Sequence, residues 1–225
     1  MEKTLNLLYL GKCDYEQALE IQFQLLKKRQ EGKISDTLIL VEHPAVITLG
    51  KSASAENVVA PEKELARQGI QRFETNRGGD VTYHGEGQIV GYPIIHLIEN
   101  QIKVRGFVEK LEKVFVNILK DFDLKATGSG KDIGVWIGNE KITAIGLAVK
   151  KGVTMHGFAF NVNTNLDHFQ FIIPCGIRDK GVTTLEKLLG ETQDFNQMNQ
   201  RVAEEFVRVY EYEKVQNITL EELNL

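Results

Sequence analysis

The chain has 225 residues, of which 42% are hydrophobic and 26% are charged, and its formal net charge is -4. This size and composition are those of a globular protein with one generous core or two small ones. The negative net charge gives no electrostatic basis for binding nucleic acid. No apolar stretch is long enough to span a membrane, so we expect a cytoplasmic protein.

The chain has two cysteines, Cys13 and Cys175. They form no CxxC motif, no metal-binding pattern and no disulfide framework, so we expect reduced thiols and no bound metal. The first ten residues include a short apolar run without a basic segment or a small-residue cleavage site. This run therefore predicts a strand rather than a leader.

A helix is predicted after this first strand. Asp14 and Gln17 have the spacing of a capping box, and apolar residues then recur at helical spacing as far as Gly32. Two buried strands follow at residues 37–42 and 45–49, and a short helix is predicted at residues 61–70.

The middle of the chain combines a glycine-rich stretch with a strong helix. Residues 77–91 are rich in glycine, and residues 89–96 resume the character of a strand. The clearest amphipathic helix covers residues 105–122, where large apolar side chains share one face.

The last part of the chain predicts a hairpin, another strand and two helices. The hairpin joins residues 133–137 and 141–149, and residues 156–162 alternate as a strand does. A second capping box, Thr183 with Glu186, predicts a short helix that ends at Gly190. An amphipathic helix carrying Val202, Phe206, Val209 and Tyr210 follows. Because no repeat or linker is present, we expect a single domain over residues 1–225.

The glycine-rich stretch is the first candidate site, with the sequence Arg77-Gly-Gly-Asp-Val-Thr-Tyr-His-Gly-Glu-Gly-Gln88. Its four glycines allow a backbone to approach a ligand closely and to present N–H donors. It matches neither a Walker A loop nor GxGxxG. An ordinary hairpin loop is the simpler reading. The many polar side chains favour a loop that lines a substrate.

Cys175 is the second candidate, in the run Phe171-Ile-Ile-Pro-Cys-Gly-Ile-Arg178. A thiol held after apolar residues and beside backbone N–H groups acts as a nucleophile if a neighbour favours the thiolate. Lys141 is the candidate neighbour. Considered alone, Cys175 is more often a small buried apolar residue, and Lys141 a solvated turn lysine.

Four motifs in fixed order resemble the lipoyl(octanoyl) transferase family over nearly the whole chain. They are Arg77–His84 with the following Gly85-x-Gly87-Gln88, Lys141-Ile-Thr-Ala-Ile-Gly146, His156-Gly-Phe-Ala-Phe-Asn161 and Pro174-Cys-Gly-Ile177. The resemblance implies an α/β (α+β) fold of mixed sheets with surrounding helices, shared with the catalytic domains of biotin and lipoate protein ligases. Glu86 departs from the family pattern, which has proline between the two glycines.

The resemblance also implies the reaction. Members of this family transfer an octanoyl group from acyl carrier protein to a lysine of lipoyl domains, without ATP or another cofactor. The role of carrying the acyl thioester then falls to Cys175, and Lys141 lowers the pKa of its thiol and assists proton transfer. The implied substrate contacts are Arg77, Gly78, Gly79, Asp80, Val81, Thr82, Tyr83, His84, Ala144, Ile145, Gly146, Gly157, Phe158 and Ala159.

The expected partners are acyl carrier protein, the lipoyl domains of 2-oxoacid dehydrogenase complexes and the glycine cleavage H protein. Neither nucleic acid nor a membrane is an expected partner, and a monomer is expected. Because acyl carrier proteins are acidic, docking calls for a local basic patch. Lys150, Lys151, Arg178 and Lys180 are the candidates for it.

Three alternatives to the transferase remain. One is an ATP-dependent lipoate or biotin ligase on the same fold, and another is an octanoyl or lipoyl amidotransferase whose donor is an acylated protein. The third is a non-catalytic module that binds acyl carrier protein, which would leave the pairing of Lys141 with Cys175 without a purpose.

Overall fold

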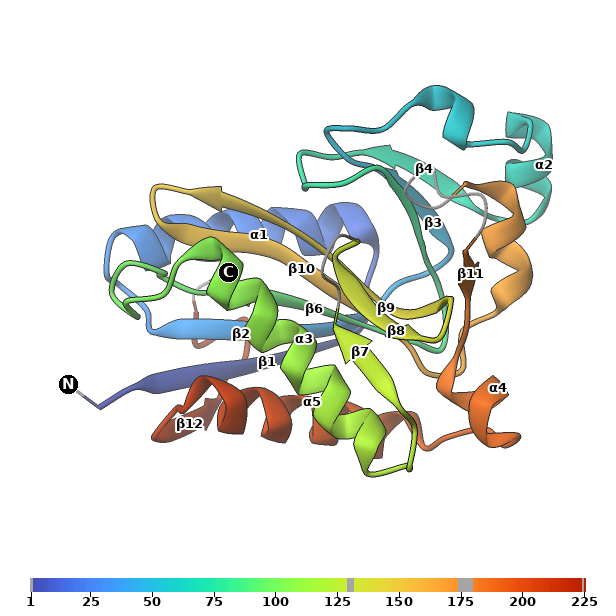
Figure 1. The fold of residues 1–225 in the computed structure, drawn as a ribbon. Helices are drawn as coiled ribbons and strands as arrows, with labels where there is room; N and C mark the ends of the chain where they lie inside the picture. Colours follow the sequence, from blue (N-terminus) through green and yellow to red (C-terminus); the bar gives the residue numbers. More distant parts are fainter. Residues whose placement is uncertain (1, 129–131, 174–179, 224) are drawn as a thin grey trace.

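The computed structural model describes residues 2–128, 132–173, 180–223 and 225. Cys175 and Arg178, two of the predicted functional residues, lie outside the described residues. In the described part, a large mixed sheet carries helices on both faces, and a small sheet stands beyond one end of it (Figure 1). The prediction of mixed sheets with surrounding helices is confirmed.

Within the described residues, the large sheet has nine strands in the order β12-β1-β2-β6-β10-β9-β8-β7, with β11 paired to β9 off this path. Parallel pairing joins β1 to β2 and β12, whereas β2, β6, β10, β9, β8 and β7 pair antiparallel in succession. The strands are β1 (Thr4–Lys12), β2 (Asp36–Glu42), β6 (Gln88–Ile94), β7 (Ala126–Gly128), β8 (Gly134–Ile137), β9 (Glu140–Lys150), β10 (Val153–Asn161), β11 (Gly181–Val182) and β12 (Lys214–Asn217).

The small sheet has the order β4-β3-β5, with β3 (Val46–Leu49) between β4 (Gln71–Glu74) and β5 (Val81–His84). The short helix α2 (Glu62–Arg67) and the 3-10 helices η1 (Ala55–Asn57) and η2 (Leu166–Phe171) complete this part of the protein. Strand β5 falls inside the stretch expected to be a loop. Three of its four residues are buried, and it pairs antiparallel with β3.

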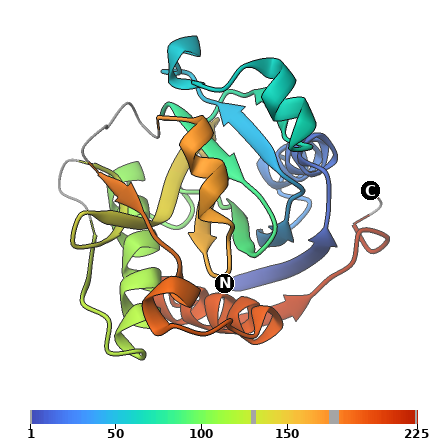
Figure 2. The ribbon, with the colours of Figure 1, turned by 90° about the vertical axis from the view of Figure 1, so that its right-hand side faces the viewer.

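The helices divide between the two faces of the large sheet. α1 (Tyr15–Gln30) covers one face, while α3 (Val104–Lys120) and α5 (Phe195–Tyr210) pack together on the other (Figure 2). Phe115 of α3 contacts Phe158 and Phe160 of β10, with ring centroids 4.8 and 5.2 Å apart. The predicted apolar face of this helix is therefore the support beneath β10.

The two predicted capping boxes do not form as expected. Asp14 occupies the N-cap position of α1, but among the described residues its side chain makes no capping hydrogen bond. The second cap lies one residue later than predicted, because Thr184, not Thr183, accepts a hydrogen bond from the N–H of Lys187 at the start of α4 (Leu185–Leu189). Gly190 ends α4 in the left-handed conformation, as its sequence position predicts.

Short strands at the margins were not predicted. β4, β7 and β12 have three or four residues each, and β11 has two; most of their residues are exposed or only partly buried. Such strands lack the apolar alternation that identifies a strand from sequence. Within the described residues, no helix has the length and apolar character needed to cross a membrane.

Candidate active site

A small cavity lies against the large sheet where β6, β9 and β10 run side by side, and the segment 77–84 closes it. Its volume is 60 Å³, room for about two water molecules. Lys141 lines this cavity, as do all of the predicted substrate contacts except Tyr83. The structure therefore brings together three motifs that lie far apart in the sequence.

Tyr83 points away from the cavity because successive side chains of a strand face opposite sides. Its ring is buried in the core of the small sheet, and its hydroxyl lies 2.7 Å from Nδ1 of His168. Burial, with a smaller effect of Glu86, raises the pKa of Tyr83 to about 12. Thr82 lines the cavity, so the motif divides between cavity and core.

The glycine-rich segment is fastened to the sheet through its backbone. The N–H of Gly78 donates to the carbonyl of Leu147 in β9 at 2.9 Å. A Cβ added to Gly146 would lie 2.9 Å from the carbonyl oxygen of Gly78, closer than real contacts allow without a shift. Glycine at 146 is therefore what lets the segment lie directly on β9.

Arg77 holds the same segment in place through hydrogen bonds to Thr48 of β3. Its side chain is 7% exposed. Its Nε donates to Oγ1 of Thr48 at 3.1 Å, and an Nη donates to the Thr48 carbonyl at 2.7 Å. A buried guanidinium bonded in this way fixes the loop and places a positive charge beside the cavity.

Lys141 lines the cavity, and its side chain packs against Trp136. Its Nζ lies 4.7 Å from the ring centroid of Trp136, the residue opposite it on β8. Nζ of Lys180 lies 4.6 Å from the same ring, and Lys180 also pairs with Asp132 at 2.5 Å. The Trp136 ring thus interacts with two ammonium groups, those of Lys141 and Lys180.

The predicted basic patch does not form as one surface. Lys150 and Lys151 lie at the far end of β9, about 30 Å along the strand from Lys141. Lys180 precedes β11, which pairs with Glu140 and Lys141 at the near end. The length of β9 thus separates Lys150 and Lys151 from Lys180. The closeness of these lysines to the motifs in the sequence did not indicate this separation.

Four further residues line the cavity although the sequence did not single them out. They are Tyr15, Val90, Tyr92 and His156. His156 is 1% exposed and has a φ of 56°, unusual for a residue other than glycine. The sequence does offer one signal that His156 belongs to the site, because it lies directly before Gly157 in the motif His156–Asn161.

The cavity histidines are neutral at physiological pH. Burial, then the charge of Arg77, lowers the pKa of His156 to about 3. Burial, then the neighbouring His43, lowers the pKa of His84 to about 3. His43 lies beneath them, bonded to the hydroxyl of Tyr92 at 2.7 Å, and burial lowers its pKa to about 4.

Of the two cysteines, the structure describes only Cys13. It is partly buried at the start of α1 and does not line the cavity. Burial, and the charge of Asp14, raise the pKa of its thiol. Both effects oppose formation of a thiolate at this position.

Comparison with known proteins decides the family. A sequence profile of the lipoyl protein ligase A/B catalytic domain matches residues 14–207. An octanoyltransferase of Alkaliphilus metalliredigens is 54% identical over 215 residues, which cover 95% of this chain and 99% of that protein. An octanoyltransferase of Desulforamulus reducens is 53% identical over 91% of this chain and 90% of its own. The chain belongs to the octanoyltransferase family.

The same fold occurs in ligases of much lower sequence identity. A lipoate-protein ligase A bound with ATP superposes with a TM-score of 0.71 at 17% identity, covering 97% of this chain and 89% of its own. A bipartite lipoate protein ligase from Thermoplasma acidophilum gives 0.71 at 16% identity, covering 97% and 87%. These similarities establish the fold alone.

Membership in the family confirms two predictions. The first is the family itself, which the four sequence motifs predicted. The second is that the protein is an acyltransferase, as the curated members of the family are. The reading of this chain as a non-catalytic binding module is therefore set aside. The roles assigned to Cys175 and to individual cavity residues remain predictions.

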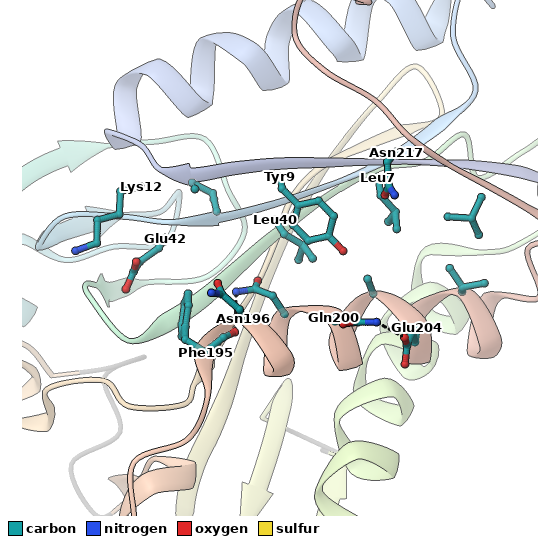
Figure 3. A pocket seen from close by; sticks show the side chains of 16 residues that line it. Leu7, Tyr9, Lys12, Leu40, Glu42, Phe195, Asn196, Gln200, Glu204 and Asn217 are labelled. Carbon is teal, nitrogen blue, oxygen red and sulfur yellow. Dashed lines mark hydrogen bonds between the residues drawn. The ribbon is translucent and has the colours of Figure 1, made fainter.

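The protein also has a larger groove on the opposite face of the sheet (Figure 3). It measures 910 Å³ and lies between α5 and the strands β1 and β2, with Leu7, Tyr9 and Leu40 on the sheet side. None of the predicted site residues that the structure describes lines it. At one end, Oε1 of Glu42 accepts a hydrogen bond from the N–H of Gly87 at 2.7 Å, and Lys12 pairs with Glu86 at 3.0 Å. Glu42 therefore holds the turn that leads into β6, while Glu86, the departure from the family pattern, makes an ion pair at the surface.

Proposed function

We propose that this octanoyltransferase moves an octanoyl group from acyl carrier protein to a lysine of a lipoyl domain, through a thioester on Cys175. The observation that carries the proposal is the high identity to octanoyltransferases over nearly their whole length. The assembly of three predicted motifs around one cavity supports it.

The first half-reaction exchanges one thioester for another. The Cys175 thiolate attacks the carbonyl of the octanoyl thioester, a new C–S bond forms, and the bond to the phosphopantetheine sulfur breaks. The departing thiolate takes up a proton, for which Lys141 is the donor. Because the acyl group stays activated throughout, this step needs no ATP.

The second half-reaction transfers the group to nitrogen. The lysine amine of the lipoyl domain attacks the thioester, a C–N bond forms, and the C–S bond to Cys175 breaks. The amine loses a proton, which neutral Lys141 accepts. Formation of an amide from a thioester makes this step downhill.

The lining of the cavity has the polarity that an acyl chain requires. Val90, Ile145 and Phe158 are apolar, but the volume of 60 Å³ admits only part of an octanoyl chain. Each methylene that it removes from water contributes about 0.8 kcal/mol. The part of the chain that enters the cavity would therefore contribute to binding in proportion to the methylenes it buries.

The deciding experiment measures the acyl-enzyme directly. The full chain is incubated with octanoyl-acyl carrier protein without ATP, and its intact mass is determined. We expect one octanoyl adduct, which Cys175→Ser abolishes and Cys13→Ser leaves intact. Absence of an adduct on the wild-type protein would exclude the thioester mechanism.

The same assay separates the two remaining alternatives. Acyl transfer that requires ATP and free octanoate would indicate a ligase. An adduct that forms only from an octanoylated lipoyl protein would indicate an amidotransferase. Transfer from octanoyl-acyl carrier protein to a lipoyl domain supports the proposal over both.

A further inference from the structure

His84 is the last member of a chain of hydrogen bonds, here called the relay. The donor and the acceptor of each bond in it can be assigned. The relay begins at the carbonyl of Thr183, which accepts from Nδ2 of Asn161 at 3.1 Å. A backbone carbonyl only accepts, so this bond fixes the amide of Asn161 with its Oδ1 as an acceptor.

Gln88 continues the relay. Its Nε2 donates to Oδ1 of Asn161 at 2.8 Å and to the carbonyl of Tyr83 at 3.2 Å. Both amide hydrogens are then used, and Oε1 is left as an acceptor facing Nδ1 of His84 at 2.8 Å. The proton of the neutral imidazole therefore resides on Nδ1, and Nε2 carries a lone pair.

The lone pair on Nε2 is available to a ligand. His84 lines the cavity, and its Nε2 makes no hydrogen bond to any residue that the structure describes. The ring of Tyr15 stacks on the imidazole, with centroids 6.0 Å apart and planes 11° apart, which restricts its rotation. Burial with neighbouring His43, Arg77 and His156 keeps the ring neutral by lowering its pKa.

We propose that Nε2 of His84 accepts a hydrogen bond from the attacking lysine amine and so fixes the orientation of that amine in the cavity. This inference rests on the proposed function. Arg77 and Lys141 place two cationic side chains at the cavity, which disfavours an ammonium and favours the neutral amine. A neutral amine has two N–H donors and one lone pair, so holding one N–H directs the lone pair.

The chemistry of the two substrates explains why the amine is the matching group. The carbonyl oxygen and sulfur of the acyl donor are acceptors and gain nothing from a second acceptor. The amine is the reacting group that donates. His84 takes no proton in this scheme, since the amine proton passes to Lys141 while the C–N bond forms and the C–S bond breaks.

The test measures the two half-reactions separately. Acylation is followed by intact mass with octanoyl-acyl carrier protein, and transfer is followed after the donor is removed and a lipoyl domain is added. We expect His84→Phe to slow transfer about 10- to 100-fold, the scale of a misplaced reactant, and to slow acylation much less. His84→Gln, which can place an oxygen near the same point, should recover part of the transfer rate.

A second variant changes the protonation of His84 without removing it. Gln88→Glu places a carboxylate beside Nδ1, which favours the imidazolium and turns Nε2 into a donor. The ratio of its transfer rate to that of wild type should therefore rise with pH. His96→Phe makes the same chemical change outside the cavity and serves as the matched control, with both half-reactions retained.

Each outcome has a defined meaning. Equal slowing of both half-reactions in His84→Phe would show that the ring only supports the cavity, and unchanged transfer would show that the amine does not use it; either result overturns the inference. A ratio for Gln88→Glu that does not vary with pH also overturns it. Failure of the wild-type protein to form any adduct would instead exclude the proposed function on which it rests.

Discussion

Lys141 is held by its surroundings more firmly than most lysines. Its side chain is 9% exposed, and its ammonium lies against the face of Trp136. A Cβ at Gly134 would come within 3.4 Å of two carbons of the Lys141 side chain. Glycine at this position therefore leaves room for the aliphatic part of that side chain. A lysine fixed in this way is a suitable source of a positive charge for a nearby thiol.

Replacing Lys141 by alanine should slow acylation most strongly near neutral pH. A free cysteine has a pKa of about 8.5, and each pKa unit by which a cation lowers it gives about tenfold more thiolate below both values. The deficit of Lys141→Ala relative to wild type should shrink as the pH rises toward 9. Rates of adduct formation from octanoyl-acyl carrier protein between pH 6 and 9 measure this.

The control for this prediction is Lys187→Ala. Lys187 pairs with Glu140, the residue directly before Lys141, at 2.8 Å, and about half of its side chain is exposed. Its removal changes the same net charge at a neighbouring position, and we expect the wild-type pH profile. A parallel profile for Lys141→Ala and wild type would contradict the activating role.

At the scale of elements, the parts with strong periodicity were predictable and the contacts between them were not. The apolar face of α3 identified that helix, because it buries a regular set of side chains. β10 was predicted from its alternation, although the structure buries all nine of its residues. β5 was hidden because glycine and polar residues surround its four positions. Tyr15 and Tyr92 reach the cavity from α1 and β6. Contacts between residues so far apart in the chain leave no local pattern in the sequence.

Gly146→Ala should test whether the glycine-rich segment must lie directly on β9. The added Cβ would lie 2.9 Å from the carbonyl oxygen of Gly78, and a backbone group yields less readily than a flexible side chain. We expect the segment to shift and acylation to slow at least about tenfold, since small displacements of reacting groups are costly. The rate of adduct formation is the measurement.

Gly106→Ala is the matched control for this substitution. Gly106 lies in α3, where an added Cβ would meet Ile102 at an ordinary distance of 3.5 Å. Alanine in a helix is favoured over glycine by about 0.5–1 kcal/mol, so this variant should be as stable as wild type or more so, with normal acylation. Normal acylation in Gly146→Ala as well would show that the close approach is dispensable.

At the scale of the whole molecule, three buried histidines couple stability to pH. His43, His84 and His156 lie together between α1, the small sheet and the large sheet, each with a folded pKa of about 3 or 4. In the unfolded chain a histidine titrates near 6.5. Below that pH the unfolded state binds protons that the folded state does not, so acid favours unfolding.

The free energy of unfolding should therefore fall steeply as the pH drops from 6.5 toward 4.5. Each such histidine contributes a slope of about 1.4 kcal/mol per pH unit in this window, so the three together give at most about 4. Denaturant unfolding at a series of pH values measures the slope. His43→Gln removes one of the three groups and should reduce the slope by about one third, whatever its effect on stability at pH 7. A free energy of unfolding that stays level between pH 7 and 5 would mean that these imidazoles do take up protons in the folded state, which would also remove the fixed acceptor assigned to His84.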